Sequence, residues 1–400
     1  MFAVFYLAIS SFWLQGVWLQ EIVTYWGQNG VSHAGGSEEE LLYYCSNFEY
    51  DVIVIGFLHV FFDSSNKDKY PSINLSKHCH GSYSSQQYPT LLNCPKIGNQ
   101  IIACQKKKKK VLISLGGASG LYGFNSKEEA VSLAGTVWNI FLGGSSTARP
   151  FGAAVLDGLD LDIEGGSSLY YTDFIKEIRS LSSQSGKRYI ITAAPQCPFP
   201  DHRLGPGKSG TVLYDIGQEF DHIYIQYYNN FCHLGSGNAF ETNIQKWFEY
   251  AKSTYDLHKK GPLIFVGLPA NKKASSKDLY YQAPDAVKTV YDKHLKVNKF
   301  FGGFMLWDAG FDQSNMQNGK TYSSNLRTFM KRLVPTKTPT NSSSEHNTTD
   351  DNSKSLHPGL IVLFILVPVL IIAIFLSSGK ILKRMSERNI SKPEEKEMTN

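Results

Sequence analysis

The fold of this 400-residue chain is decided by ten residues, Asp157-Gly158-Leu159-Asp160-Leu161-Asp162-Ile163-Glu164-Gly165-Gly166. Because side chains alternate between the two faces of a strand, an extended chain here turns three carboxylates to one side and three apolar side chains to the other. Such a row is costly to bury unless the carboxylates are hydrogen-bonded or protonated. Their like charges raise the pKa of at least one member, as a general acid working near neutral pH requires. We therefore predict a strand that carries catalytic carboxylates.

Two other interpretations of this stretch are less favoured. A solvated acidic face on an edge strand would involve no catalysis, but Gly165-Gly166 ends the run abruptly and the alternate positions are all large and apolar. A calcium loop of the EF-hand type requires glycine at its sixth position, where this chain has Asp162.

Short apolar runs recur along the chain, and helix-like stretches separate several of them. The apolar runs cover residues 22–25, 52–57, 111–115, 158–163, 189–193, 222–226, 264–267 and 303–306, and the helix-like stretches include 126–141, 170–182, 241–255 and 277–295. Strands that alternate with helices indicate parallel βαβ units. Eight such strands predict an α/β fold, a closed (β/α)8 barrel of about 250–300 residues. Catalytic groups in that fold lie at the carboxyl ends of strands, and Glu164 ends the fourth run.

The composition indicates a large apolar core rather than a nucleic-acid binder. Hydrophobic residues make up 42% of the chain, and the formal net charge is only +5. Part of that charge comes from the lysines at 106–110, which precede an apolar run and are expected to form a solvated turn or a helix end. We therefore expect no nucleic-acid partner.

The first residues resemble a secretory signal peptide. Residues 2–13 form a short apolar run followed by small and polar residues, although no Lys or Arg precedes it. We expect residues 1–19 to be the signal, with the mature chain beginning near Trp18 to Glu21.

A second apolar run, residues 360–376, is interrupted only by Pro368 and Ala373 among its Leu, Ile, Val and Phe residues. A helix over 359–378 would be about 30 Å long, enough to cross a membrane. Several cations follow it, so residues 379–400 are predicted to be a cytoplasmic tail: Lys380, Lys383, Arg384 and Arg388. A GPI signal would end in its apolar stretch, and a core helix would lack these flanking charges, so we predict a single transmembrane helix.

Residues 335–358 are rich in Ser, Thr and Asn and predict a stalk between the anchor and a catalytic barrel at 20–334. Glycosylation sequons begin at Asn341 and Asn347 in the stalk and at Asn74 in the barrel. Together these features predict a monomeric, single-pass type I membrane protein with an extracellular catalytic domain at the cell surface.

The chain has six cysteines, and an even number in a secreted protein predicts disulfides: Cys45, Cys79, Cys94, Cys104, Cys197 and Cys232. Their spacing does not choose among the possible pairings. No CxxC motif or histidine cluster suggests a metal site, and none is expected.

The acidic stretch resembles the DxxDxDxE signature of glycoside hydrolase family 18. Four other segments resemble motifs of that family, above all of its plant and fungal class III chitinases, in the same order along the chain. They are Tyr25-Trp26-Gly27-Gln28-Asn29-Gly30 on the first strand, Ser114-Leu115-Gly116-Gly117 on the third, Gln226-Tyr227-Tyr228-Asn229-Asn230 on the sixth and Gly303-Phe304-Met305-Leu306-Trp307 on the last. The resemblance covers about residues 20–333.

The resemblance implies an endo-acting chitinase that needs no cofactor. It would hydrolyse β-1,4 links of N-acetylglucosamine polymers with retention, assisted by the substrate's own acetamido group. Glu164 would protonate the leaving oxygen and then deprotonate water. Asp162 would hydrogen-bond the acetamido N–H, and Tyr228 would donate its hydroxyl to the acetamido oxygen. Asp160 would share a proton with Asp162 or serve only as its buried partner.

The resemblance also implies the binding residues and the disulfides. Trp307 would form the floor beneath the reacting sugar, and Gln226 and Asn229 would support the site. Tyr25, Gln28 and Phe57 match lining positions, with core packing as the alternative. The implied disulfides are Cys45–Cys104, Cys79–Cys94 and Cys197–Cys232.

Two other functions remain open beside chitinase activity on cell-wall chitin. Some relatives keep this barrel as lectins or inhibitors after losing the acid, but Glu164, Asp162 and Tyr228 are all present here. An endo-β-N-acetylglucosaminidase acting on N-glycans shares the acid signature, but the first-strand motif and the six cysteines favour the chitinase.

Overall fold

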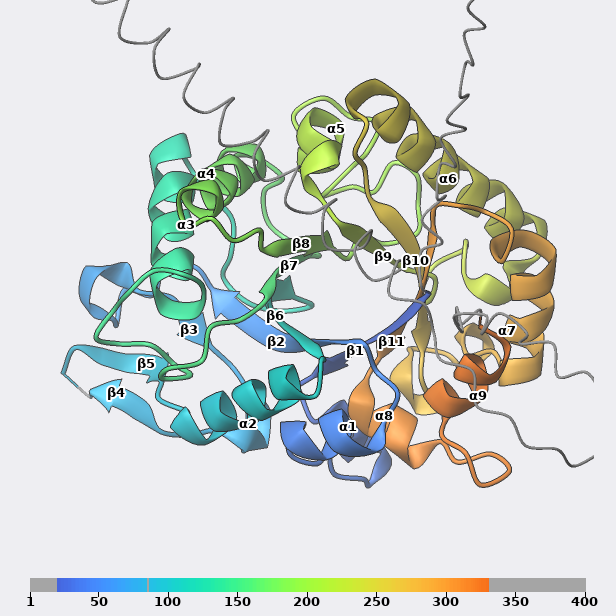
Figure 1. The fold of residues 1–400 in the computed structure, drawn as a ribbon, viewed down its shortest axis with the longest axis horizontal. Coiled ribbons are helices and arrows are strands. Elements are labelled where there is room, and N and C mark those ends of the chain that lie inside the picture. The colour runs from blue at the N-terminus through green and yellow to red at the C-terminus, as the bar shows by residue number, and fades with distance from the viewer. Residues whose placement is uncertain (1–19, 85, 331–400) are drawn as a thin grey trace, which may run out of the picture. The chain divides into compact units, whose positions relative to one another are not determined.

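The computed structural model describes residues 20–84 and 86–330, in which a ring of strands is surrounded by helices (Figure 1). The predicted signal peptide, stalk, transmembrane helix and tail, with Asn341 and Asn347, lie outside these residues. Within the described ranges, none of the helices combines the length and the apolar character needed to cross a membrane.

Eight parallel strands form the barrel. They are β1 (Glu21–Trp26), β2 (Val52–Val60), β6 (Lys110–Gly117), β7 (Gly158–Ile163), β8 (Ile190–Ala193), β9 (His222–Gln226), β10 (Leu263–Pro269) and β11 (Phe301–Trp307). Each strand pairs with the next in sequence order, and β1 pairs with both β2 and β11, which closes the ring. The predicted (β/α)8 barrel is therefore confirmed, with a strand at each of the eight predicted runs.

Nine α-helices are described, at α1 (Leu41–Asn47), α2 (Pro95–Lys106), α3 (Lys127–Phe141), α4 (Tyr171–Gln184), α5 (Val212–Ile216), α6 (Asn238–His258), α7 (Pro284–Val290), α8 (Ala309–Ser314) and α9 (Tyr322–Phe329). Three predicted helices correspond to α3, α4 and α6. Ser126 begins α3 by accepting a hydrogen bond from the Glu129 N–H, as an N-cap serine does. The lysine run begins where α2 ends and finishes at the start of β6, as predicted.

The prediction of one helix over residues 277–295 is partly wrong. A short 3-10 turn, Asp278–Tyr280, comes first, and α7 begins only at Pro284. Proline disfavours the helical conformation of the residue before it, and Ala283 is accordingly extended. A single π-helical turn, Tyr291–Leu295, then continues α7.

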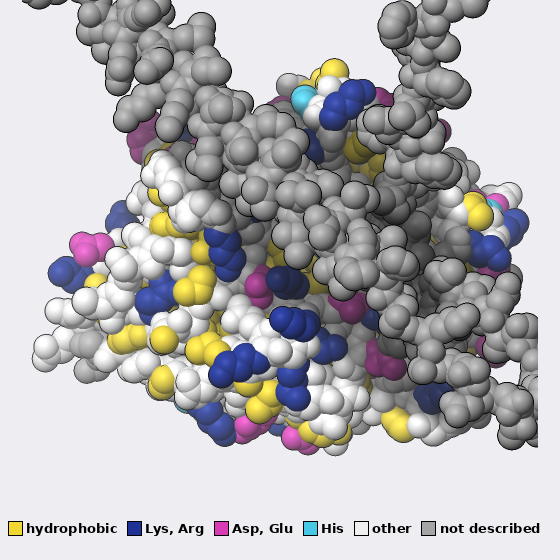
Figure 2. Space-filling model, in the orientation of Figure 1, with side chains coloured by type: hydrophobic (Ala, Val, Ile, Leu, Met, Phe, Trp, Pro, Cys, Tyr) yellow, Lys and Arg dark blue, Asp and Glu magenta, His cyan; other side chains and the backbone are white. Residues whose placement is uncertain are grey.

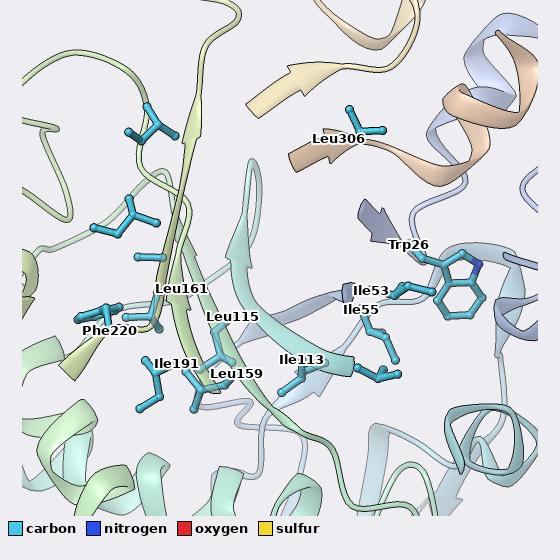
Figure 3. Close-up of a cluster of buried hydrophobic side chains, with 14 of the residues drawn as sticks. Trp26, Ile53, Ile55, Ile113, Leu115, Leu159, Leu161, Ile191, Phe220 and Leu306 are labelled. Atoms are coloured by element: carbon cyan, nitrogen blue, oxygen red, sulfur yellow. The ribbon is translucent and has the colours of Figure 1, made fainter. Parts of the chain in front are cut away.

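The two faces of β7 lie in different environments, one apolar and one acidic. Leu159 and Leu161 point outward into a buried apolar cluster with neighbours such as Ile113 and Ile191 (Figure 3). Asp160 and Asp162 point into the barrel and are 0% and 4% exposed. Because β7 lies between β6 and β8 and its acidic side chains are buried, the interpretation as a solvated edge strand is wrong.

Short strands extend the barrel beside β2. β3 (Ser72–Ile73) pairs antiparallel with β2, and β4 (Ser82–Ser84) pairs with β5 (Tyr88–Leu92). Three disulfides match the pairs implied by the resemblance: Cys45–Cys104, Cys79–Cys94 and Cys197–Cys232. The first joins α1 to α2, the second closes the insertion around β4 and β5, and the third joins the segments that follow β8 and β9.

Candidate active site

Asp160 is held by side chains from three other strands. Ser114 on β6, Asp160 on β7 and Thr192 on β8 are paired in register. The Ser114 and Thr192 hydroxyls donate to the carboxylate at 2.7 Å and 2.6 Å. A third donor, the Tyr25 hydroxyl of β1, reaches it at 2.8 Å. Asp160 is thus buried beneath the site with three hydrogen bonds and faces no open space.

Asp162 lies one step nearer the carboxyl end of β7. Gln226, the last residue of β9, donates from Nε2 to Asp162 Oδ1 at 2.9 Å and to the Ala194 carbonyl at 3.1 Å. Gln226 therefore fixes the orientation of this carboxylate, in addition to lining the cavity.

The carboxylates of this row all have raised pKa values. Burial is the main cause for Asp160, and its three hydrogen bonds partly offset it. Burial, followed by the charges of Glu164, Asp160 and Asp201, raises the pKa of Asp162 well above its usual range. Burial also raises the pKa of Glu164, while hydrogen bonds with Gln226 and Gln196 favour its ionised form. A partly buried carboxyl with a raised pKa, at the edge of a cavity, can hold and release a proton near neutral pH.

A cavity of about 430 Å³ opens over the end of β7. Of the ten predicted catalytic and binding residues, nine line it: Tyr25, Gln28, Phe57, Asp162, Glu164, Gln226, Tyr228, Asn229 and Trp307. Asp160 is the exception, because it lies beneath Asp162 in the barrel interior. Tyr228 is 7% exposed, and burial raises the pKa of its hydroxyl well above the usual range, so it stays a hydrogen-bond donor.

Three aromatic side chains form one wall of this cavity. The Trp307 ring lies 5.7 Å from that of Tyr25 and 6.1 Å from that of Phe57, between centroids. Trp307 and Phe57 are nearly parallel, at 21°. Flat apolar faces of this kind can pack against sugar rings while polar groups surround them.

Two predicted binding residues also hold loops in place. Gln28 donates to the carbonyls of Gly56 and Asn74 at 2.7 Å and 3.0 Å. Asn229 accepts from the backbone N–H and the hydroxyl of Ser276, both at 2.9 Å.

The two glycines of the third-strand motif are required by close backbone contacts. Gly116 has φ +112°, and a Cβ there would lie 2.2 Å from the carbonyl oxygen of Asp162. Gly117 has φ +92°, and its Cβ would lie 3.0 Å from the Phe57 ring. A side chain at either position would push apart the strand and the aromatic wall of the cavity.

Two residues that follow β8, Asp201 and Gln196, also act on the acidic row and were not predicted from the sequence. Asp201 is buried and accepts from the backbone N–H groups of Gln196, Arg203 and Leu204 at 3.1, 2.9 and 2.6 Å. Its charge raises the pKa of both Asp162 and Glu164. Neither residue stands in an apolar or periodic pattern, so no sequence signal pointed to them.

A second buried acidic pair behind Trp307 was also missed. Glu38 accepts from the Gly27 and Asn29 N–H groups, both at 3.0 Å, and from His78 at 2.8 Å. Asp308 caps α8 through the Phe311 N–H. Burial and the Glu38 charge raise the pKa of Asp308 well above its usual range. These groups hold the first-strand turn against the end of β11.

Three curated proteins similar to this chain are named as chitinases. Chitinase 3 of Candida albicans is 35% identical over 78% of this chain and 51% of its own length, and Chitinase 2 of Rhizopus oligosporus is 39% identical over 76% and 53%. The chain thus spans about half the length of these two curated relatives. Endochitinase 2 of Metarhizium robertsii is 36% identical over 78% of this chain and 74% of its own.

Two solved structures, a chitinase and an inhibitor protein, share the fold of this chain. The ICChI chitinase of Ipomoea carnea has 32% identity and a TM-score of 0.61, over 78% of this chain and all of its own. The xylanase-α-amylase inhibitor protein XAIP-I has 31% identity and the same TM-score, over 78% and 99%. A sequence model described as glycosyl hydrolases family 18 matches residues 21–279, well over half of the chain. The family resemblance is therefore confirmed, and the chain belongs to the glycosyl hydrolases of family 18.

Proposed function

We propose that this protein is an endo-acting chitinase that hydrolyses β-1,4 links between N-acetylglucosamine units with retention of configuration. The observation that carries the proposal is the row on β7. Asp160 is locked by three hydroxyl donors, Asp162 is oriented by Gln226, and Glu164 stands at the cavity with a raised pKa. The chitinase names of the relatives that share this barrel support the same activity.

In the first step, protonated Glu164 donates its proton to the glycosidic oxygen. The acetamido carbonyl oxygen of the same sugar attacks the anomeric carbon, and the bond to the leaving sugar breaks. The product is a cyclic oxazolinium, whose positive charge faces Asp162. Tyr228, kept protonated by its burial, donates to the acetamido oxygen and orients it.

In the second step, ionised Glu164 removes a proton from water, which attacks the anomeric carbon and reopens the ring. The two inversions at that carbon restore the β-configuration. Asp160 does not touch the sugar in this scheme; it sets the charge and position of Asp162 from below. Trp307 packs against the apolar face of the reacting sugar.

Endo action is supported by two hollows that continue the cavity beyond the carboxyl ends of β2 and β6. One neighbouring hollow shares His59 and Asn74 with it, and another shares Ala118 and Ser119 and is lined by Gly165 next to the acid. These hollows offer room for sugar units beyond those held over Glu164, as a polymeric substrate requires.

The cellular setting that we propose rests on sequence outside the described residues. A signal peptide at 1–19 would direct the barrel at 20–334 out of the cell, and a stalk at 335–358 would join it to a transmembrane helix at 359–378 and a cytoplasmic tail at 379–400. The three disulfides suit an oxidising compartment. The described part of the face in Figure 2 mixes Lys and Arg with Asp, Glu and apolar side chains, which suits a neutral polysaccharide. Cell-wall chitin is the proposed substrate at that surface.

A binding protein is the second candidate, because XAIP-I shares this fold and is named as an inhibitor. The test uses N-acetylglucosamine oligomers with the purified chain and its Glu164→Gln variant. Cleavage to β-anomer products by the parent, with binding but no cleavage by the variant, supports the chitinase. Binding without turnover by both would make the protein a lectin. Release of N-glycans, with oligomers left intact, would identify the endo-β-N-acetylglucosaminidase.

A further inference from the structure

Asn74 lies on the wall between two cavities, immediately after β3. The cavity over Glu164 and a second one of about 370 Å³ share only two lining residues, His59 and Asn74. The second cavity is lined by polar side chains that include Asp63, His80 and Thr90. A long polymer that follows this groove away from Glu164 must therefore pass Asn74.

The backbone at Asn74 is fixed. Asn74 and Phe57 exchange two backbone hydrogen bonds of 3.0 Å, and the Gln28 amide donates to the Asn74 carbonyl at 3.0 Å. The next residue, Leu75, is buried with 1% exposure and anchors the segment. The position of Asn74 relative to the aromatic wall is therefore well defined.

The Asn74 side chain is exposed, in contrast to its backbone. Its Oδ1 accepts from the Ser76 N–H at 2.8 Å. No partner of Nδ2 is found among the described residues, and Nδ2 is the atom to which an N-linked glycan is attached. Asn74-Leu75-Ser76 is a glycosylation sequon, so the acceptor sequence and an accessible acceptor atom coincide at the edge of the groove.

We propose that Asn74 carries an N-linked glycan and that this glycan narrows the groove between the two cavities. The inference rests on the proposed function. A bulky glycan rooted on the dividing wall hinders chains that extend beyond His59 but leaves the space over Glu164 open to short oligomers. Occupancy of one sequon thus sets the length of substrate that the enzyme prefers.

The experiment uses the full chain produced in a glycosylating eukaryotic host. Mass spectrometry of the peptide containing Asn74 measures occupancy. Asn74→Gln and Ser76→Ala each remove the sequon, the second while keeping the asparagine. A control with both Ser343→Ala and Thr349→Ala removes the two sequons of the predicted stalk. The ratio of hydrolysis rates on polymeric chitin and a short oligomer is compared, with binding to chitin beads as a parallel readout.

We expect a glycan on Asn74, and a several-fold rise in the polymer-to-oligomer ratio and in bead binding in both sequon variants, with no change in the control. Native enzymatic removal of the glycan from the parent chain should give the same rise, which guards against a folding defect in a variant.

An unmodified Asn74 peptide overturns the proposal. An occupied Asn74 with an unchanged polymer-to-oligomer ratio in the sequon variants also overturns it. A ratio that changes in Asn74→Gln but not in Ser76→Ala overturns it as well, because the effect would then belong to the Asn74 amide and not to the glycan. If neither the parent chain nor any variant cleaves either substrate, the chitinase assignment fails. Occupancy of Asn74 and binding to chitin beads then still test whether the glycan narrows the groove.

Discussion

The Tyr25 hydroxyl on β1 donates a 2.8 Å hydrogen bond to Asp160 on β7, across the interior of the barrel and 135 residues along the chain. The same Tyr25 ring lies against Trp307 and Phe57 in the cavity wall. One side chain therefore links the position of the aromatic wall to the buried carboxylate at the base of the acidic row on β7.

Tyr25→Phe keeps the ring and removes this hydrogen bond. We expect the free energy of unfolding to fall by about 1–3 kcal/mol, because a buried carboxylate loses a donor. We also expect kcat to fall, since the pKa of Asp160 rises further and its influence on Asp162 changes. Tyr227→Phe is the control, because its hydroxyl donates to Asn243 at 3.0 Å, away from the carboxylates. Equal pH–rate profiles for parent and Tyr25→Phe would contradict the link.

The pH dependence of hydrolysis should shift in opposite directions in two variants. Gln196 stabilises ionised Glu164, so Gln196→Met should raise the pKa of Glu164 and move the alkaline limb of kcat/KM to higher pH. The charge of Asp201 raises that pKa, so Asp201→Asn should move the same limb to lower pH. Initial rates across the pH range measure both. Shifts of the same sign would show that Glu164 does not set the alkaline limb.

Asp162→Asn should stabilise the protein more at pH 7 than at pH 4. The native pKa of Asp162 lies above its unfolded value, so the native state binds the extra proton. The free energy of unfolding therefore falls as pH rises from about 4 through the native pKa, and Asn removes this loss. Melting temperatures of parent and variant at the two pH values test the prediction.

Asp221 provides a control, because its pKa is lowered where that of Asp162 is raised. Burial raises its pKa, but hydrogen bonds and charges from groups that include Arg179 and Arg188 outweigh burial and leave it lowered. Asp221→Asn should therefore cost more stability at pH 7 than at pH 4. A constant difference between Asp162→Asn and the parent at both pH values would refute the assignment of a raised pKa.

Gly116→Ala should be severely destabilising. Its Cβ would lie 2.2 Å from a backbone oxygen of β7, and its φ of +112° is unfavourable for alanine. We expect a loss above about 2 kcal/mol in the free energy of unfolding. Gly152→Ala, at φ +57° with no atom within 4 Å of the added Cβ, should lose about 1 kcal/mol. Urea unfolding of the two variants gives the comparison, and similar losses would count against the close contact.

Trp307→Ala should weaken binding of oligomers and raise KM, because the apolar surface beneath the sugar is lost. Trp307→Phe, which keeps a smaller ring, should retain part of the affinity. Calorimetric titration in the Glu164→Gln background isolates binding from turnover. Equal affinity for all three proteins would assign Trp307 to core packing alone.

The strands could be predicted from sequence because each is a short apolar run, and the acidic row was visible because its period of two is preserved through Glu164. The interruption at Pro284 was missed because the polar and apolar spacing continued across it. β3 and β4 are too short to give a periodic signal, and β5 contains a proline, Pro89, which is unusual within a strand. Asp201 and Glu38 reach the site only because the fold brings distant segments together, and no pattern in a single sequence marks such residues.

The closure of the barrel bears on how this protein is synthesised. β11 lies between β1 and β10, so β1, one of the first segments to leave the ribosome, lacks one of its two neighbours until residues 301–307 have emerged. Pairings between such distant segments form late. Until then, the nascent chain presents two open sheet edges and an uncovered apolar interior. During translation, the sheet edges of β1 and of the growing sheet therefore stay open until the final strand arrives.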